Sequence, residues 1–455
     1  MKFTSTRGSE EASLDEALAA GIARDGGLFL PDSLPQFRIE DFDGASSVRE
    51  VASIVLRPFF EGSRLASDFG QIVGETVSFP TPLRKLPVAT GHLHLLELFH
   101  GPTAAFKDVG AGFLAACLSR LQDDDTKPLT ILVATSGDTG GAVAAAFNDR
   151  ARMRVVILFP EGRVSERQAR QLTCWGDNVL ALAVRGSFDD CQAMAKQAMA
   201  DEDLKHEFRF SSANSINIGR LLPQSTYYAH ASLARYRETG RKPSFIVPSG
   251  NLGNALGLLL ARHMGLPIAD VILATNANRV IGDYLDSGQW RPRETVRTLA
   301  SAMDVGDPSN MERVRSLFGD AAALHRLMRA CSVTDEQIEQ EIRDIHKEFD
   351  CAVCPHTATA CYVYRQLGDE EQRMKDWIVV ATAHPAKFEQ IVEPLIGETL
   401  PLPDSLAEIL DRPVQSVSID ADAGSFKAAL CRGFRLDDGV ASGDKYGLSA
   451  WISGE

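Results

Sequence analysis

Short runs of β-branched and other apolar residues alternate with helical patterns through most of this chain. The runs that are expected to form strands lie at residues 93–99, 129–134, 155–159, 179–184, 245–247, 271–275 and 377–381. Helical patterns follow several of them, at residues 141–147, 165–174, 189–200 and 255–263. Strands that are apolar on both faces are typical of parallel sheets covered by helices. The sequence therefore predicts an α/β protein built on mostly parallel, helix-covered sheets.

The N-terminal part of the chain lacks this alternation. Apolar residues recur at roughly helical spacing over residues 12–24 and 48–69, and a short apolar strand is expected to end at Pro31. Three prolines then punctuate the chain before residue 88, and proline commonly ends regular structure. We therefore expect a compact, largely helical N-terminal domain over residues 1–88.

Charge and composition limit the classes of partner. The 455 residues carry a formal net charge of −14, which argues against nucleic acid or an anionic membrane surface. No apolar run is long enough to span a membrane, and residues 1–7 lack the apolar stretch of a signal peptide. Eight scattered cysteines in a chain of this length favour reduced thiols over a disulfide framework. We expect a cytoplasmic protein without nucleic-acid or membrane partners.

Cys351 and Cys354, followed by His356, form the one pattern that suggests a metal site or a redox pair. A zinc site needs a second close pair of ligands, and the sequence offers none beside them. We interpret these thiols as buried, apolar-like side chains and predict no metal site.

Lys107 lies between Phe106 and a helical pattern at residues 109–118. Desolvation and the positive end of a helix both favour the neutral amine, which is the nucleophilic form. A neutral amine can form a Schiff base with an aldehyde cofactor and then move protons as a base. The alternative is a surface lysine whose stem lies on apolar neighbours.

A glycine-rich loop at residues 247–254 follows an apolar strand and opens an apolar helix. Gly250 and Gly253 allow a sharp turn and a close approach of the backbone to a ligand. Consecutive N–H groups at a helix start bind anions, and Asn251 and Asn254 add amide donors. The loop is neither a Walker loop nor a dinucleotide-binding fingerprint. It predicts a phosphate site, and a plain strand-to-helix turn is the alternative.

A second loop, at residues 134–141, occupies the same place between a strand and a helix. Ser136 and Thr139 contribute hydroxyl groups and Asp138 a carboxylate. Exposed N–H groups beside hydroxyls suit a substrate carboxylate. Thr382 ends another buried strand, where its hydroxyl can reach a ligand in the sheet crevice. Such a neutral partner would leave a pyridine nitrogen unprotonated.

Many separated segments, in one order, resemble the threonine synthase family of fold-type II pyridoxal-phosphate enzymes. They lie at residues 5–8, 25–28, 97–108, 135–140, 214–220, 248–254, 302–305, 355–357 and 381–388. The resemblance implies a fold-type II architecture with two sheet domains and an N-terminal unit. It also implies a catalytic region over residues 89–430, a smaller mobile subdomain over about 128–225 and a C-terminal tail over 431–455.

The resemblance implies a cofactor, pyridoxal 5'-phosphate, bound covalently by Lys107. It places Thr382 at the pyridine nitrogen, and the loop of Ser136, Asp138 and Thr139 at the substrate carboxylate. The residues implied to cradle the cofactor phosphate are Gly250, Asn251, Leu252, Gly253 and Asn254. The implied reaction converts O-phospho-L-homoserine and water into L-threonine and phosphate, the last step of threonine biosynthesis, in a monomer or homodimer.

Alternatives and departures accompany this resemblance. A related phospho-lyase would release a keto acid and phosphate, and a non-catalytic pyridoxal-phosphate-binding paralogue would turn over nothing. Arg279 stands where many family members carry Asp, and Asp283 stands where many carry a basic residue. Three basic residues are candidates to hold the substrate phosphate, namely Arg7, Arg163 and Lys387.

Overall fold

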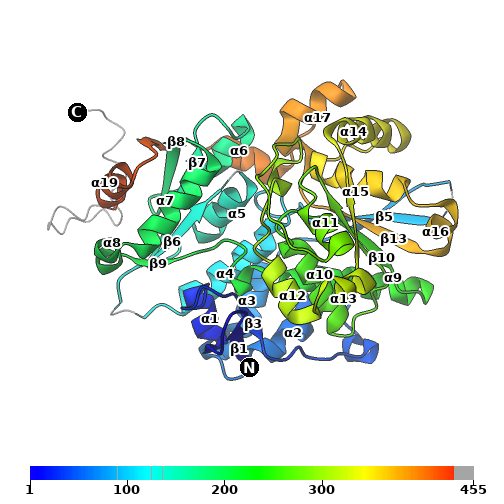
Figure 1. Cartoon of the computed structure of the whole chain (residues 1–455), viewed down its shortest axis with the longest axis horizontal. Coiled ribbons are helices and arrows are strands. Elements are labelled where there is room, and N and C mark those ends of the chain that lie inside the picture. Colours follow the sequence, from blue (N-terminus) through cyan, green and yellow to red (C-terminus); the bar gives the residue numbers. More distant parts are fainter. Residues whose placement is uncertain (90, 124–125, 136, 435–455) are drawn as a thin grey trace.

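The computed structural model describes residues 1–89, 91–123, 126–135 and 137–434. Two helix-covered sheets form most of the molecule: one lies on the left of Figure 1 and one on the right, with the N-terminal residues below them. The predicted α/β class with mostly parallel sheets is confirmed. In the described part of the chain, no helix combines the length and the apolar character needed to cross a membrane.

The larger sheet has six strands in the order β12-β11-β10-β13-β5-β4. Its strands are β4 (Leu83–Leu86), β5 (His92–Glu97), β10 (Ser244–Pro248), β11 (Val271–Thr275), β12 (Arg329–Ser332) and β13 (Asp376–Ala381). Neighbouring strands are parallel, except that β4 pairs with β5 antiparallel. Every residue of β10, β11 and β13 is buried, because helices cover both faces of a parallel sheet. This burial explains why the sequence segments that form these strands are apolar on both faces.

The smaller sheet has five parallel strands in the order β14-β8-β7-β6-β9. Its strands are β6 (Leu129–Ala134), β7 (Met153–Pro160), β8 (Val179–Arg185), β9 (Arg209–Ser211) and β14 (Val417–Asp420). The helices that belong to it are α5 (Asp138–Phe147), α6 (Glu166–Thr173), α7 (Phe188–Ala200), α8 (Glu202–Glu207) and α19 (Ala423–Gly433). The edge strand β14 comes from near the C-terminal end of the described chain and pairs with β8.

The larger sheet carries most of the remaining helices (Figure 1). They are α4 (Lys107–Arg120), α9 (Gln224–Thr239), α10 (Gly253–His263), α11 (Val280–Ser287), α12 (Met311–Phe318), α13 (Ala321–Leu327), α14 (Asp335–Phe349), α15 (Pro355–Arg365), α16 (Asp369–Met374), α17 (Glu389–Ile396) and α18 (Asp404–Leu410). Short 3-10 turns are η4 (Ile218–Arg220), η5 (Ser301–Met303) and η6 (Pro385–Phe388). These turns carry residues of the candidate site described below.

The N-terminal unit contains more than the expected helices. It also has an antiparallel sheet in the order β2-β1-β3. Its elements are β1 (Lys2–Ser5), β2 (Glu11–Ser13), α1 (Leu14–Ala20), β3 (Phe29–Pro31), η1 (Ile39–Phe42), α2 (Val48–Leu56), η2 (Arg57–Phe60), η3 (Arg64–Asp68) and α3 (Phe69–Thr76). The strand expected to end at Pro31 is confirmed as β3.

Two expected N-terminal helices are shorter than the sequence pattern indicated, for local reasons. The helix expected over residues 12–24 is α1, which ends at Gly21 in a left-handed conformation (φ 73°), where glycine is favoured. The pattern over residues 48–69 divides into α2, two 3-10 turns and the start of α3. Pro58 lies in the first of these turns, where a regular α-helix would lose a backbone hydrogen bond.

Candidate active site

Three neighbouring strands of the larger sheet end at one edge. β10, β13 and β5 are parallel and adjacent, so the segments that follow their carboxyl ends meet there. These segments are residues 249–254 after β10, residues 382–384 after β13 and residues 98–107 after β5. Each contains at least one predicted site residue. The sheet topology thus explains how residues far apart in sequence come to one place.

Hydrogen bonds between backbone groups join the segment before Lys107 to the end of β13. The N–H of Leu98 donates to Ala381, the N–H of Phe106 donates to Thr382 (2.9 Å), and the N–H of His384 donates to Ala104 (3.0 Å). Thr382 therefore lies directly beside the residue that precedes Lys107. Its side chain is buried, as expected for a residue that ends a central strand.

Lys107 is the first residue of α4, so this helix begins earlier than the expected residue 109. Its side chain is 15% exposed. Burial lowers the pKa of Lys107 below its usual value; Asp138 opposes this shift, and Lys387 and Arg220 add to it. The expected desolvated lysine at a helix start is therefore present, and its amine is displaced toward the neutral, nucleophilic form.

Asp138, the first residue of α5, brings the smaller sheet to this lysine. One carboxylate oxygen lies 3.7 Å from Lys107 Nζ, and the other lies 2.9 Å from Lys387 Nζ. The Gln168 amide also donates to Asp138, at 3.3 Å. Burial alone would raise the pKa of Asp138, but Lys387 and Lys107 hold it below its usual value. Asp138 is therefore an ionised carboxylate that lies between two lysine amines.

The 250–254 loop leads into α10, which begins at Gly253. Leu252 precedes the helix in a left-handed conformation (φ 61°) and provides no side-chain cap. Asn254 accepts hydrogen bonds from the Tyr227 and Tyr228 hydroxyls, both at 2.7 Å. Its Nδ2 is buried and has no partner among the described residues. The start of α10 therefore presents donors that the protein itself leaves unused, which suits an anion.

The other members of this loop have structural partners. Asn251 donates to Ser215 Oγ (2.9 Å) and accepts from Ser309 Oγ (3.0 Å), so its side chain anchors the loop. A Cβ atom on Gly250 would lie 2.6 Å from Met303 Cα. Glycine at 250 is therefore required by a neighbouring backbone. At Gly253 a Cβ atom would meet Leu221 Cδ2 at 3.2 Å, the mobile end of a side chain.

The 134–141 loop opens α5. Gly137 is its N-cap residue and, lacking a side chain, offers no cap of its own (φ 146°). The Thr135 hydroxyl accepts from the N–H groups of Gly137 and Gly140. Thr139 lies half-buried in the first turn, and its hydroxyl has no hydrogen-bond partner among the described residues. Ser136, the remaining predicted member, lies outside the described residues.

Two further features of this edge were not assigned a role from the sequence. The buried His356 accepts a hydrogen bond from the Ala302 N–H at 3.0 Å, and burial lowers its pKa to about 4, so the ring is neutral. Asp304 accepts hydrogen bonds from Thr298 and Asn276 at 2.7 and 2.8 Å. These contacts hold the turn that packs against the 250–254 loop. Both residues lie in segments that resemble the family. This resemblance was the signal in the sequence that could have identified them.

The three basic residues that are candidates to hold the substrate phosphate differ in their partners and in their burial. Arg7 forms an ion pair with Glu312 at 2.8 Å, and Arg163 is exposed. Lys387 is the one of the three that contacts a predicted site residue, and its side chain is completely buried. Arg279 pairs with Asp283 at 2.9 Å, so the apparent charge exchange preserves an ion pair.

Cys351 and Cys354 are both buried free thiols. Burial raises the pKa of each thiol, which disfavours the thiolate form that metals and electrophiles require. Cys354 Sγ lies 3.2 Å from Thr357 Oγ1. The two thiols therefore behave as packing residues at the start of α15.

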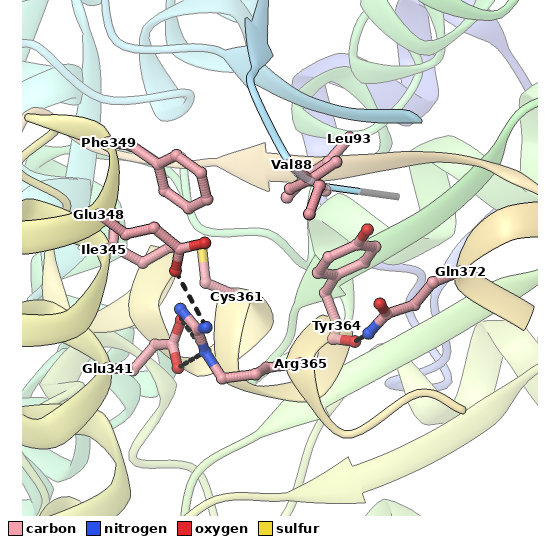
Figure 2. A pocket seen from close by; sticks show the side chains of 11 residues that line it. Val88, Leu93, Glu341, Ile345, Glu348, Phe349, Cys361, Tyr364, Arg365 and Gln372 are labelled. Atoms are coloured by element: carbon pink, nitrogen blue, oxygen red, sulfur yellow. Dashed lines mark hydrogen bonds and ion pairs between the residues drawn. The ribbon is translucent and has the colours of Figure 1, made fainter. Parts of the chain in front are cut away.

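A cavity of about 170 Å³ lies at the other end of α15. Figure 2 shows Arg365 between Glu341 and Glu348, with Tyr364 and Gln372 beside them. The cavity contains none of the predicted site residues. It is separate from the candidate active site.

The residues at the sheet edge match the requirements of an aldehyde cofactor that carries a phosphate. Lys107 offers a desolvated amine, α10 offers unused donors at its start, and Thr382 offers a buried hydroxyl. α5 offers a second helix start beside Lys107. One chain thus supplies a nucleophile and two anion sites around a common point.

Comparisons with known proteins agree with this reading. Residues 75–383 match a family described as pyridoxal-phosphate dependent enzyme, residues 2–77 match the threonine synthase N terminus, and residues 357–430 match the threonine synthase C-terminal family. The threonine synthase of Escherichia coli K12 is 40% identical over 424 residues, covering 93% of this chain and 97% of the relative.

Solved structures give the same result. The crystal structure of threonine synthase from Escherichia coli superposes with a TM-score of 0.84 and 38% identity, covering 94% of this chain and 99% of that one. A pyridoxal-phosphate-bound threonine synthase from Brucella melitensis gives a TM-score of 0.86 and 34% identity, covering 95% of this chain and 99% of that one. The similarity therefore extends over nearly the whole chain.

Proposed function

This chain belongs to the threonine synthase family of pyridoxal-phosphate-dependent enzymes, and we propose that its sheet-edge residues convert O-phospho-L-homoserine and water into L-threonine and phosphate. The protein is a lyase that uses pyridoxal 5'-phosphate. The main support for this proposal is the position of Lys107. Segments from both sheets meet at its buried amine.

Cofactor binding in this proposal uses three of the loops. The amine of Lys107 binds the aldehyde, and the N–H groups at the start of α10 hold the phosphate, with Gly250, Leu252, Gly253 and Asn254 lining the turn. Asn251 supports the loop from behind through Ser215 and Ser309. Thr382 faces the pyridine nitrogen as a neutral partner. When bound, the cofactor supplies an electrophilic carbon and a ring that delocalises electrons from the substrate.

The residues of the chain then handle the substrate. N–H groups at the start of α5, with the hydroxyls of Ser136 and Thr139, hold its carboxylate. Lys107 Nζ takes a proton from the α carbon, releases it so that the amine is neutral again, and later takes a proton from the β carbon. Asp138 contributes its backbone to the carboxylate site, because its own carboxylate would repel the substrate carboxylate.

We also propose a domain organisation for the chain. Residues 89–430 form the catalytic region, and residues 128–225 form a smaller mobile subdomain that carries the substrate loop. A separate apolar cluster supports this subdomain: it includes Leu132, Leu158 and Leu182 of the smaller sheet. Residues 1–88 form the N-terminal domain, apart from β4 (Leu83–Leu86), which joins the larger sheet. The C-terminal tail is proposed over residues 431–455, of which 435–455 lie outside the described residues.

Product analysis tests the function. The purified protein is incubated with O-phospho-L-homoserine, and phosphate, L-threonine and 2-ketobutyrate are followed together. We expect phosphate and threonine in near-equal amounts. Mostly 2-ketobutyrate would identify a phospho-lyase, and no phosphate release would identify a non-catalytic paralogue.

Thr139→Val should uncouple phosphate release from threonine formation. Removing one hydroxyl contact to the substrate carboxylate costs about 1 kcal/mol, roughly a fivefold loss of affinity. A loosened substrate leaves before water adds, so 2-ketobutyrate should appear at the expense of threonine. Thr139→Ser keeps a hydroxyl and should behave like the parent. An unchanged product ratio in Thr139→Val would remove Thr139 from the carboxylate site.

Thr382→Asp should change which bonds react. A carboxylate at this place stabilises a protonated pyridine nitrogen, and one pKa unit corresponds to about a tenfold change in that equilibrium. We expect less threonine and more abortive chemistry at the α carbon. Thr382→Asn, a neutral variant of similar size to Asp, is the matched control. If Asp and Asn variants give the same products, charge at this position has no role.

A further inference from the structure

Three charged side chains from three elements meet in the protein interior. They are Lys107 at the start of α4, Asp138 at the start of α5 and Lys387 on η6. The Asp138 carboxylate lies 3.7 Å from Lys107 Nζ and 2.9 Å from Lys387 Nζ. The Lys387 and Asp138 side chains are 0% and 4% exposed. A buried pair of this kind keeps its electrostatic strength, because solvent and salt do not screen it.

Lys387 is tied to the segment before Lys107 as well. Its amine donates to the Thr103 carbonyl at 2.6 Å. The Thr103 N–H in turn donates to the carboxylate of Asp108, the residue after Lys107, at 2.9 Å. Lys387 therefore touches both the carboxylate that faces Lys107 and the backbone that leads to it.

The smaller sheet domain fixes the other side of this cluster. Gln168 on α6 donates to Asp138 at 3.3 Å, and Gln171 on the same helix donates to the Thr103 carbonyl at 3.2 Å. The ion pair between Asp138 and Lys387 thus joins the two sheet domains at the site.

The charge balance of this cluster matters for the substrate. O-phospho-L-homoserine carries a carboxylate and a phosphate, so an uncompensated carboxylate in the same site would repel it. Lys387 is the cation placed to compensate Asp138, since its amine lies 2.9 Å from that carboxylate and its side chain is fully buried. The charge of Lys387 is thereby paired with Asp138 rather than left free for the substrate phosphate.

We propose that Asp138 and Lys387 are positioning residues for Lys107: Asp138 holds the lysine amine toward the start of α5, and Lys387 compensates the Asp138 charge. The inference rests on the proposed function for its substrate. The three side chains act as one unit that is complete only when both domains are in contact.

The groups that face Lys107 predict the signs of the effects. Asp138 on α5 attracts the protonated amine, while Lys387 on η6 and Arg220 on η4 repel it. His356 on α15 is neutral and interacts with Asp138, Lys107 and Lys387. Removing Asp138 should therefore lower the pKa of Lys107, and removing Lys387 should raise it.

The experiment measures the Lys107 amine directly. The full chain, stripped of cofactor, is acylated with a limiting amine reagent over a range of pH, and the extent of modification at Lys107 is read by peptide mass spectrometry. Asp138→Asn should shift the half-modification pH down by about one unit, and Lys387→Met should shift it up by about one unit. Shifts of the same sign, or none, would overturn the proposal.

A double variant distinguishes the loss of a coupled ion pair from general misfolding. Asp138→Asn leaves Lys387 buried without its counterion, which is destabilising, whereas the double variant Asp138→Asn/Lys387→Met removes both charges. The double variant should melt at a higher temperature than Asp138→Asn, and its Lys107 half-modification pH should lie between those of the two single variants. A double variant less stable than both singles would contradict a coupled pair.

Kinetics of the cofactor-loaded enzyme provide an independent reading. Asp138→Asn should lower kcat without raising KM, because it misplaces the amine while it removes a negative charge that repels the substrate. If Asp138 instead bound the substrate through its side chain, KM would carry the change, and the proposal would be wrong. Absence of threonine formation in the parent would refute the proposed function while leaving the acylation result valid.

Discussion

Lys107→Ala is expected to lose nearly all threonine formation while the protein stays folded. The variant removes both the amine that binds the cofactor aldehyde and the base that moves protons at the substrate carbons. Loss of a general base alone typically costs about 10²- to 10⁴-fold, and loss of the covalent attachment adds to this. Thermal unfolding checks that the variant remains folded, since the Lys107 side chain is only 15% exposed. Phosphate release and threonine formation are the measurements.

Chemical trapping decides whether Lys107 is the attachment site. Borohydride should fix the cofactor to a peptide containing Lys107 in the parent and to no peptide in Lys107→Ala. Lys387 is the informative competitor, because its amine lies 2.9 Å from the same carboxylate. A fixed cofactor on the Lys387 peptide would make our assignment wrong. The exposed Lys205→Ala serves as the control and should keep the parent's turnover.

Gly253→Val is expected to weaken cofactor binding by about 10- to 100-fold, because the loss of one or two hydrogen bonds to a charged phosphate has this magnitude. A β-branched side chain at the first residue of α10 would cover the N–H groups that the phosphate must approach. Folding should suffer less, since the nearest atom to its Cβ would be the end of the Leu221 side chain, at 3.2 Å, and no backbone atom lies among its close neighbours. Titration with pyridoxal phosphate, together with thermal unfolding, separates the two effects.

Variants at two other glycines serve as controls for Gly253→Val. Gly368 also precedes a helix, and a Cβ atom there meets nothing within 4 Å, so Gly368→Val should leave cofactor affinity unchanged. Gly250→Ala would place its Cβ atom against the Met303 backbone, so it should reduce thermal stability together with affinity. If Gly253→Val binds the cofactor as tightly as the parent, the phosphate lies elsewhere.

The loops that follow the buried strands could be predicted from the sequence. Strands of a parallel sheet are apolar on both faces, and this gives a strong local pattern. The strands that became β6, β10 and β13 are apolar on both faces, and each is followed at once by a loop with chemical groups. The convergence of Lys107 with Thr382 then follows from strand adjacency. Strand order itself was not predictable, because pairing depends on contacts between distant segments.

The features that the sequence missed depend on long-range contacts. Short strands such as β9 and β12 are partly exposed and carry no clear alternation. The role of Lys387 was not predictable either, because it depends on Asp138, a residue that the smaller sheet brings to it. Gly250 looked like a ligand-binding glycine, yet its nearest neighbour is the Met303 backbone, which no local pattern reveals.

The pairing of β14 with β8 has a consequence for how the protein is made. β8 leaves the ribosome long before Val417–Asp420, the residues that cover its edge. Throughout that interval the nascent chain presents an unpaired strand edge, which is a template for association with other chains. The smaller sheet therefore completes its folding only after the entire larger sheet has been synthesised. Biosynthesis of this fold thus favours protection of the β8 edge until β14 has been made.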